Sequence, residues 1–195
     1  ILKAVEEFTS LYGEKDYSVF TVSGRSEISG NHTDHNRGEV LAASVSLDII
    51  AVAAPTDDGK IYVKSEGFSQ NEVDLADLDP VAGEEGTSSA LIRGVCDGFA
   101  KNNRSIGGFC AYMTSNVLGG SGLSSSAAFE DMIGNIENHL YNDGALDYIE
   151  VSQISRYAEN VHFGKPCGLM DQIACACGGF VHIDFADPKK PVCEK

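Results

Sequence analysis

The chain has 195 residues, of which 43% are hydrophobic and 22% charged, a composition typical of one compact domain that buries its own core. Fourteen basic residues stand against 29 acidic ones, and the resulting formal charge of -15 repels nucleic acid and anionic lipid over most of the surface. No apolar run approaches the roughly 20 residues that cross a bilayer, so we expect neither nucleic acid nor a membrane as partner.

The first third of the chain predicts one helix and two strands. Apolar residues recur about one helical turn apart over residues 4–12, which predicts a short amphipathic helix. Residues 17–23 and 39–54 are rich in β-branched and aromatic side chains, and these runs end at Gly24 and Pro55. We therefore expect two strands on either side of a polar loop.

The segment after the second strand predicts a hairpin. Residues 56–59 (TDDG) suit a tight turn because Asp-Gly tolerates positive backbone angles, and the next strand follows at 61–65 (IYVKS). Residues 66–86 are acidic and rich in turn formers. We expect a surface loop there.

The second half mixes helices and strands without a regular βαβ order. Strand-like runs lie at 109–113 and 180–185, and helical spacing recurs over 90–99, 128–140, 149–162 and 169–177. The mixture predicts an α+β fold, a mixed sheet with helices packed on it.

The six cysteines form no CxxC pair and no dense framework, and a chain of this length needs no disulfides to hold its core. We expect free thiols in a reducing, cytoplasmic environment, most of them small core residues. They are Cys96, Cys110, Cys167, Cys175, Cys177 and Cys193.

A glycine- and serine-rich loop stands before the helix at 128–140. Its backbone can approach a ligand closely, the first N–H groups of the helix have no internal partners, and serine hydroxyls add hydrogen-bond donors. Such a helix start attracts phosphate, although no GK[ST] follows the glycines, and a flexible loop with a serine N-cap is the alternative. The loop comprises Gly119, Gly120, Ser121, Gly122, Leu123, Ser124, Ser125 and Ser126.

This run, GGSGLSSSAA, resembles the second motif of the GHMP kinases, the superfamily of galactokinase, homoserine, mevalonate and phosphomevalonate kinases. The resemblance implies that the loop wraps the phosphates of ATP. It also implies that Ser126 contacts Mg²⁺.

The polar loop at 24–36 places an arginine, histidines, carboxylates and amides within thirteen residues. Such density suits a sugar, whose hydroxyls need both donors and acceptors. A solvated loop with Asx turns at Asp34 and Asn36 is the alternative. A metal site at His32 and His35 lacks a third ligand nearby apart from Asp34.

GRSEISGNHTDHNRGEVL, starting at Gly24, resembles the galactokinase motif GRxNxxGEHTDYNxGxVL. The resemblance implies that Arg25 lies beside a catalytic aspartate. It implies further that the side chains at Asn31, His32 and Asp34 hold the sugar hydroxyls.

The departures from this motif fall at its centre. The motif's Asn is Glu27 here, its Glu is Asn31, and its Tyr is His35. An amide at Asn31 still bonds a hydroxyl but lacks the charge that strengthens a carboxylate contact. We therefore expect either weaker binding of galactose or a related hexose in its place.

A third segment carries two acids twelve residues apart. In isolation, Asp171 is explained as a helix-end residue and Glu159 as part of a solvated face. GKPCGLMDQ, however, resembles the galactokinase segment GxPCGIMDQ. The resemblance implies that Asp171 takes or orients the proton of the anomeric hydroxyl and that Arg25 keeps it ionised. It also implies a backbone contact from Gly168 to the sugar, and Mg²⁺ shared by Glu159 and Ser126.

Three motifs in the family's order predict an ATP- and Mg²⁺-dependent sugar 1-kinase that phosphorylates the anomeric hydroxyl. Family members are about twice as long, so residues 1–195 are expected to be the N-terminal GHMP kinase domain with its sugar-binding loop, weakly active or inactive without a C-terminal domain. Two alternatives are a non-catalytic sugar and ATP sensor and a GHMP kinase for another small alcohol.

Overall fold

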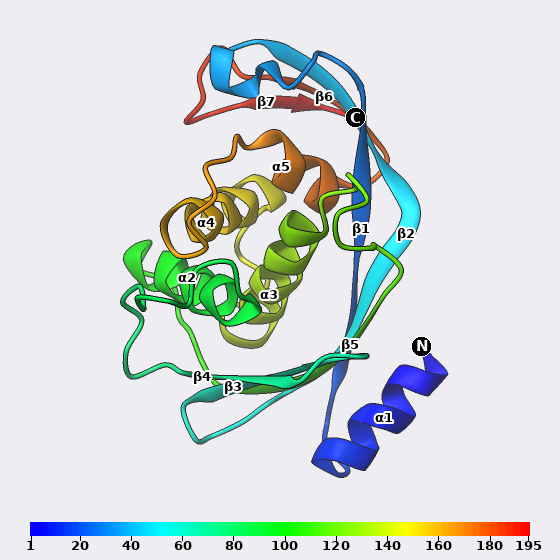
Figure 1. Cartoon of the computed structure of the whole chain (residues 1–195), viewed down its shortest axis with the longest axis vertical. Helices are drawn as coiled ribbons and strands as arrows, with labels where there is room; N and C mark the ends of the chain where they lie inside the picture. The colour runs from blue at the N-terminus through cyan, green and yellow to red at the C-terminus, as the bar shows by residue number, and fades with distance from the viewer.

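The computed structural model describes residues 1–195 as a curved sheet that partly encloses a group of helices (Figure 1). In chain order the elements are α1 (Leu2–Tyr12), β1 (Ser18–Ser29), the 3-10 turn η1 (Thr33–Asn36), β2 (Glu39–Pro55), β3 (Lys60–Ser65), β4 (Gln70–Asp74), α2 (Ser88–Lys101), β5 (Phe109–Ser115), α3 (Ser125–Tyr141), α4 (Tyr148–Val161), α5 (Met170–Cys177), β6 (Phe180–Asp184) and β7 (Val192–Glu194).

The sheet is organised around β2. One edge of this strand pairs with β1, while its other edge pairs with β5 through its C-terminal part and with β6 through its N-terminal part. The order β4-β3-β5-β2-β6-β7 completes the sheet, in which β3 and β5 are parallel and every other pair is antiparallel. This mixed sheet with helices on it confirms the predicted α+β class.

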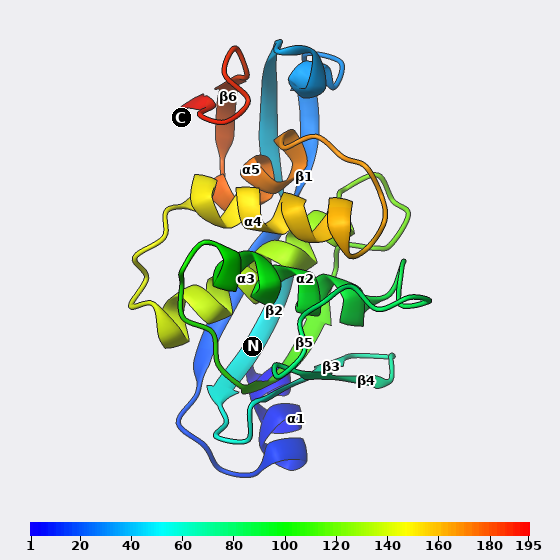
Figure 2. The ribbon, with the colours of Figure 1, turned by 90° about the vertical axis from the view of Figure 1, so that its left-hand side faces the viewer.

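The helices lie in two tiers on one face of the sheet. α3 and α5 lie against β1 and β2, while α2 and α4 pair with each other farther out (Figure 2). α1 covers the opposite face and buries Phe8 against β2 and β5. No helix is long and apolar enough to cross a membrane.

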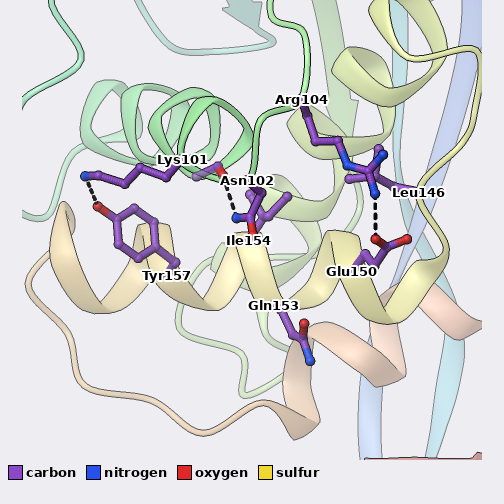
Figure 3. Close-up of a pocket in the computed structure, with 9 residues that line it drawn as sticks. Lys101, Asn102, Arg104, Leu146, Glu150, Gln153, Ile154 and Tyr157 are labelled. Carbon is purple, nitrogen blue, oxygen red and sulfur yellow. Dashed lines mark hydrogen bonds and ion pairs between the residues drawn. The ribbon is translucent and has the colours of Figure 1, made fainter. Parts of the chain in front are cut away.

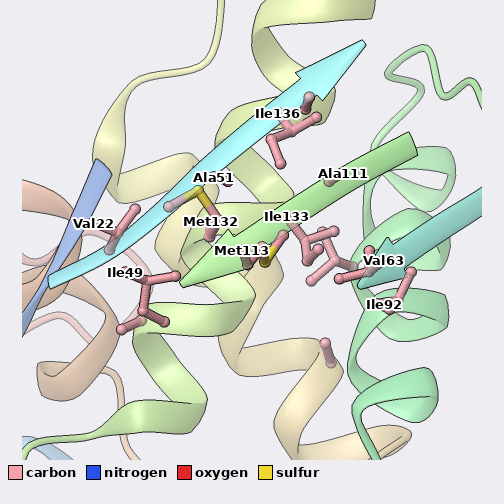
Figure 4. Packing of buried hydrophobic residues seen from close by; sticks show 14 of the residues in the cluster. Val22, Ile49, Ala51, Val63, Ile92, Ala111, Met113, Met132, Ile133 and Ile136 are labelled. Atoms are coloured by element: carbon pink, nitrogen blue, oxygen red, sulfur yellow. The ribbon is translucent and has the colours of Figure 1, made fainter. Parts of the chain in front are cut away.

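Most of the core lies between the sheet and the inner helices. It is a cluster of 25 buried residues in which Ile49 and Met113 of the sheet face Met132 and Ile133 of α3 (Figure 4). This packing fixes the start of α3 relative to β1. A smaller cluster under α5 holds that helix against β6.

The prediction that the first strand ends at Gly24 was wrong. β1 continues to Ser29, with a register shift between Ser23 and Arg25. A Cβ at Gly24 would lie 3.0 Å from the Leu123 carbonyl oxygen, so the glycine lets the shifted strand meet the glycine loop closely. The residue that looked like a strand end lies at a register shift, where β2 carries the additional residues between Ser44 and Asp48.

The predicted hairpin at 56–59 was also wrong, because β5 inserts between β2 and β3. Within the predicted loop at 66–86 the structure has β4, and β7 was not predicted at all. Both are short edge strands, and in β4 only Val73 is buried. Backbone pairing with β3 forms β4 although its side chains carry almost no strand pattern.

Candidate active site

The centre of the site is an ion pair between Arg25 of β1 and Asp171 of α5, residues 146 positions apart. The guanidinium donates from Nε to Asp171 Oδ1 and from Nη2 to Oδ2, each over 2.8 Å. Its Nη1 donates to the carbonyl oxygen of Gly122 at 2.8 Å. One arginine therefore holds the acid and the glycine loop together.

Asp171 also accepts a hydrogen bond of 2.6 Å from the hydroxyl of Ser124. Burial alone would raise the pKa of Asp171, but the hydrogen bonds from Arg25 and Ser124, with the charge of Arg25, outweigh burial and hold it below its ordinary value. Asp171 is therefore an anion at neutral pH.

The glycine loop runs directly into α3. Gly120 and Gly122 have φ of 74° and 78°, which glycine adopts without a steric cost, and Ser124 continues in the left-handed region with φ of 57°. A Cβ on either glycine would meet no other atom of the chain. The backbone of the loop is thus open on its outer side, next to the first N–H groups of a 17-residue helix.

A second group of residues gathers at Glu159 near the end of α4. Its Oε1 accepts hydrogen bonds of 2.8 Å both from the Ser126 hydroxyl and from the Lys165 ammonium. Its Oε2 accepts one of 2.9 Å from the amide of Gln172. The structure therefore brings the two predicted metal ligands together, and it adds two residues that sequence reasoning did not single out.

Glu130 lies beneath this group in the core. Its Oε2 accepts a hydrogen bond of 3.2 Å from the same Gln172 amide that holds Glu159, and its other carboxylate oxygen has no hydrogen-bond partner. Burial, together with the neighbouring charge of Glu159, raises the pKa of Glu130 well above its ordinary value.

The predicted sugar-loop residue Asp34 caps the start of α5. Its Oδ2 accepts hydrogen bonds from the N–H groups of Leu169 at 2.8 Å and Met170 at 3.1 Å. A Cβ on Gly168 would overlap this carboxylate, at 1.7 Å from Oδ2. The predicted sugar-binding loop and the segment that carries Asp171 are therefore joined through Asp34, and only glycine fits at 168.

Glu27, one of the departures from the galactokinase motif, holds His32. It accepts from the backbone N–H of His32 at 3.0 Å and lies 3.0 Å from the imidazole Nε2. Asn31 is exposed, with φ of 56°. Asn31 and His32, which are both predicted to bind the sugar, thus lie at the rim of the site on a left-handed turn. Asparagine tolerates this conformation well.

A cavity of about 590 Å³ opens beside the glycine loop, and the predicted residues Gly119, Ser125 and Ser126 form part of its wall. The rest of the lining comes from sequence-distant segments, among them Leu91 of α2 and Phe163 after α4. No local motif marks these residues, so sequence reasoning missed them.

A second cavity of about 210 Å³ lies between α2 and α4 (Figure 3). Its charged side chains are already paired, Arg104 with Glu150 at 2.8 Å and Lys101 with the Tyr157 hydroxyl at 2.6 Å. None of the predicted site residues lines it.

Comparison with known sequences agrees with this geometry. The chain matches the galactokinase galactose-binding signature over residues 6–55 and the N-terminal domain of the GHMP kinases over residues 90–179. It is 32% identical to galactokinase of Streptomyces coelicolor over 184 residues, which cover 94% of this chain and 47% of that protein. Galactokinase of Clostridium tetani is also 32% identical, over 89% of this chain and 44% of its own length.

The fold agrees as well. Lactococcus lactis galactokinase, in a crystal structure with galactose, superposes with a TM-score of 0.88 and 27% identity over 98% of this chain and 51% of its own. Methanococcus jannaschii mevalonate kinase shares the fold with a TM-score of 0.74, at 14% identity over 93% of this chain and 57% of its own. The chain spans about half the length of these relatives, and it carries the galactokinase galactose-binding signature together with a match to the N-terminal domain of the GHMP kinases.

Proposed function

We propose that the full-length protein is an ATP-dependent sugar 1-kinase, which transfers the γ-phosphate of ATP to the anomeric hydroxyl of galactose or a related hexose. The observation that carries this proposal is the Arg25–Asp171 pair, which joins the sugar-binding loop, the glycine loop and the start of α5 at one point. The curated relatives named galactokinase support the same assignment.

In this proposal Asp171 faces the anomeric hydroxyl. A sugar hydroxyl is a poor nucleophile, and phosphoryl transfer depends mostly on alignment and on stabilisation of dispersed negative charge. Because the Arg25 guanidinium keeps Asp171 ionised, the carboxylate orients the hydroxyl and accepts its proton late in the transfer.

The sugar is held by the side chains of Asn31, His32 and Asp34 and by the backbone of Gly168. Asp34 Oδ2 accepts two backbone hydrogen bonds, from Leu169 and Met170, whereas Oδ1 accepts one, from the N–H of His35, and so retains a lone pair for a hydroxyl. The imidazole of His32 is held in position by the carboxylate of Glu27. Asn31 offers a neutral amide, which suits a hydroxyl but binds it less strongly than a carboxylate does.

The phosphates of ATP bind along the glycine loop from Gly119 to Ser126 and the first turn of α3, where N–H groups and hydroxyls supply donors. Mg²⁺ fits Ser126 and Glu159, because a hard cation prefers oxygen ligands and the two side chains meet within 2.8 Å. An ion held by these two side chains would supply positive charge that offsets the charge of the phosphates.

The cavity of about 590 Å³ is the proposed site of the adenine base. Its volume lies within the range of small-molecule pockets. Leu91, Met113 and Phe68 offer apolar surface, while Asn71 and Thr114 offer hydrogen-bonding groups. Ser126 at its wall links this cavity to the proposed metal site.

We further propose that residues 1–195 are the N-terminal domain of a longer enzyme, whose C-terminal domain completes the site. The chain covers 47% of the Streptomyces coelicolor relative, which agrees with such a division. All six cysteines are free, in keeping with a reducing cytoplasm.

ADP release by the full-length protein over a panel of hexoses tests the function. We expect turnover with galactose or a close epimer, with the phosphate on the anomeric oxygen. Sugar and ATP binding without ADP release for every hexose would favour a sensor, whereas turnover only with mevalonate or homoserine would favour a kinase for another alcohol.

A further inference from the structure

The exposed residue Lys165 forms an ion pair with one of the most buried acids of the chain. Its ammonium lies 2.8 Å from Glu159 Oε1, and the side chain of Lys165 is 59% exposed whereas that of Glu159 is only 2% exposed. The backbone N–H of Lys165 also donates to the Glu159 carbonyl oxygen at 3.1 Å. The backbone of Lys165 is thus held in place, and its exposed side chain reaches Glu159 from the solvent side.

The loop that carries Lys165 is held in place by its own contacts. Gly164 turns the chain with φ of 79°, and the side chain of Asn160 accepts a hydrogen bond of 2.7 Å from the N–H of Cys167. The amide of Asn160 donates to the Cys167 carbonyl oxygen at 3.4 Å. Lys165 therefore projects from a defined position.

Cations are scarce around the proposed phosphate position. Neither the glycine loop nor the lining of the large cavity contains a lysine or arginine. Arg25 is already committed to Asp171 and to the Gly122 carbonyl oxygen. Lys165 therefore supplies the available positive charge beside Ser126, in a chain of net charge -15.

Lys165 and Ser126 share the same oxygen of Glu159, at 2.8 Å each. A divalent cation bound to that oxygen and to Ser126 would lie close to the lysine ammonium, and like charges at that separation repel. The flexible stem lets the ammonium leave the carboxylate while its backbone stays in place.

We propose that Lys165 is a resident counter-ion which neutralises Glu159 before nucleotide binds and then moves to the phosphate oxygens of the incoming metal–nucleoside triphosphate. This inference rests on the proposed nucleotide site and adds a phosphate-binding residue to it. A lysine is a compact point charge suited to this exchange between a carboxylate and a phosphate.

Amine acylation of the full-length wild-type protein, read by mass spectrometry, tests the exchange without a mutation. Mg²⁺ alone should free the ammonium and raise the acylation of Lys165 at least twofold. Mg²⁺ with ATP should lower it at least threefold. Lys101, which is similarly exposed and pairs with Asp97, is the internal control and should not change. Constant acylation of Lys165 under conditions where ATP binds would overturn the inference.

Calorimetric titration of full-length variants with ATP gives a second test. Lys165→Met should weaken ATP binding about five- to tenfold, Lys165→Arg should restore it to within threefold, and the matched control Lys101→Met should leave it unchanged. ATP binding by Lys165→Met at the wild-type level would contradict the inference. Failure of the wild-type protein itself to bind ATP would instead contradict the proposed function.

Discussion

Two departures from the galactokinase motif, Glu27 and Asn31, change how the sugar side of the site is built. Glu27 bonds both the backbone and the imidazole of His32, so its carboxylate is used within the protein. Asn31 occupies a left-handed position that favours asparagine over most other residues. Compared with the motif, the carboxylate is therefore at Glu27, which supports His32, and no longer at position 31 on the rim.

Asn31→Glu in the full-length protein should therefore favour galactose. A carboxylate accepts a hydroxyl hydrogen bond more strongly than an amide does, and we expect KM for galactose to fall about fivefold relative to other hexoses. The left-handed turn should cost about 1 kcal/mol of stability.

Asn31→Gln is the control, because glutamine has the length of glutamate and the same difficulty in adopting a left-handed backbone, but no charge. It therefore separates the effect of the charge from the effect of the backbone strain. Steady-state kinetics over the hexose panel, with a melting curve for each variant, makes the comparison. An equal shift in sugar preference for both variants would contradict the charge argument.

At this scale the contiguous motifs of the sequence predicted two contacts that the structure shows, while the roles of these residues stay predictions. Arg25, Asp171, Ser126 and Glu159 meet in pairs as expected. Lys165 was not singled out, because its meaning depends on a distance across the fold rather than on its neighbours in sequence.

The helix α3 begins at the glycine loop and carries three acids, Glu130, Asp131 and Glu137, into the interior. Burial raises the pKa of Glu137 to about 8, although a hydrogen bond from Gly107 and one from Cys96 act in the opposite direction. Burial likewise raises the pKa of Asp131 well above its ordinary value. These carboxyl groups favour the protonated state in the fold.

Glu137 makes the free energy of unfolding depend on pH. The folded chain keeps this proton up to about pH 8, whereas the unfolded chain releases it near the model-peptide pKa of 4.5. Between these values the unfolded state binds fewer protons, so the contribution of Glu137 to stability falls as pH rises and levels off above pH 8.

Glu137→Gln removes that contribution while an amide oxygen still accepts from Gly107. We expect Tm to fall between pH 6 and pH 8 by about 4 °C less in this variant than in the wild type. Glu72→Gln, at an exposed position of β4, is the matched control and should follow the wild type. Parallel Tm curves for Glu137→Gln and wild type would contradict the account.

At the scale of elements, clear hydrophobic patterns predicted the helices and the central strands, whereas segments with weak patterns were predicted wrongly or not at all. The five helices and the strands with apolar runs lie close to their predicted ranges, except that β1 continues past Gly24 to Ser29. The edge strands β4 and β7 were missed, because pairing with a neighbour rather than side-chain pattern forms them. The hairpin failed because local turn chemistry cannot report that β5 inserts between β2 and β3.

Across the whole molecule, the elements of the site come from the start, the middle and the last third of the chain. Arg25 follows Gly24 in β1, the glycine loop precedes α3, and Asp171 lies in the first turn of α5. The α+β class could be predicted from the order of elements, but the cavity could not, because its lining is assembled from many segments. We propose that a C-terminal domain completes this arrangement in the full-length enzyme.

The measurement that tests the central claim most directly is the turnover of full-length Asp171→Asn, with ATP and the best hexose. Loss of the carboxylate should lower kcat by about 10²- to 10⁴-fold and leave the affinity for ATP within threefold, because the proposed role of Asp171 is on the sugar hydroxyl. Asp187→Asn, at an exposed position after β6, should keep wild-type turnover. An Asp171→Asn enzyme that retains more than about a tenth of wild-type kcat would contradict the role assigned to the Arg25–Asp171 pair.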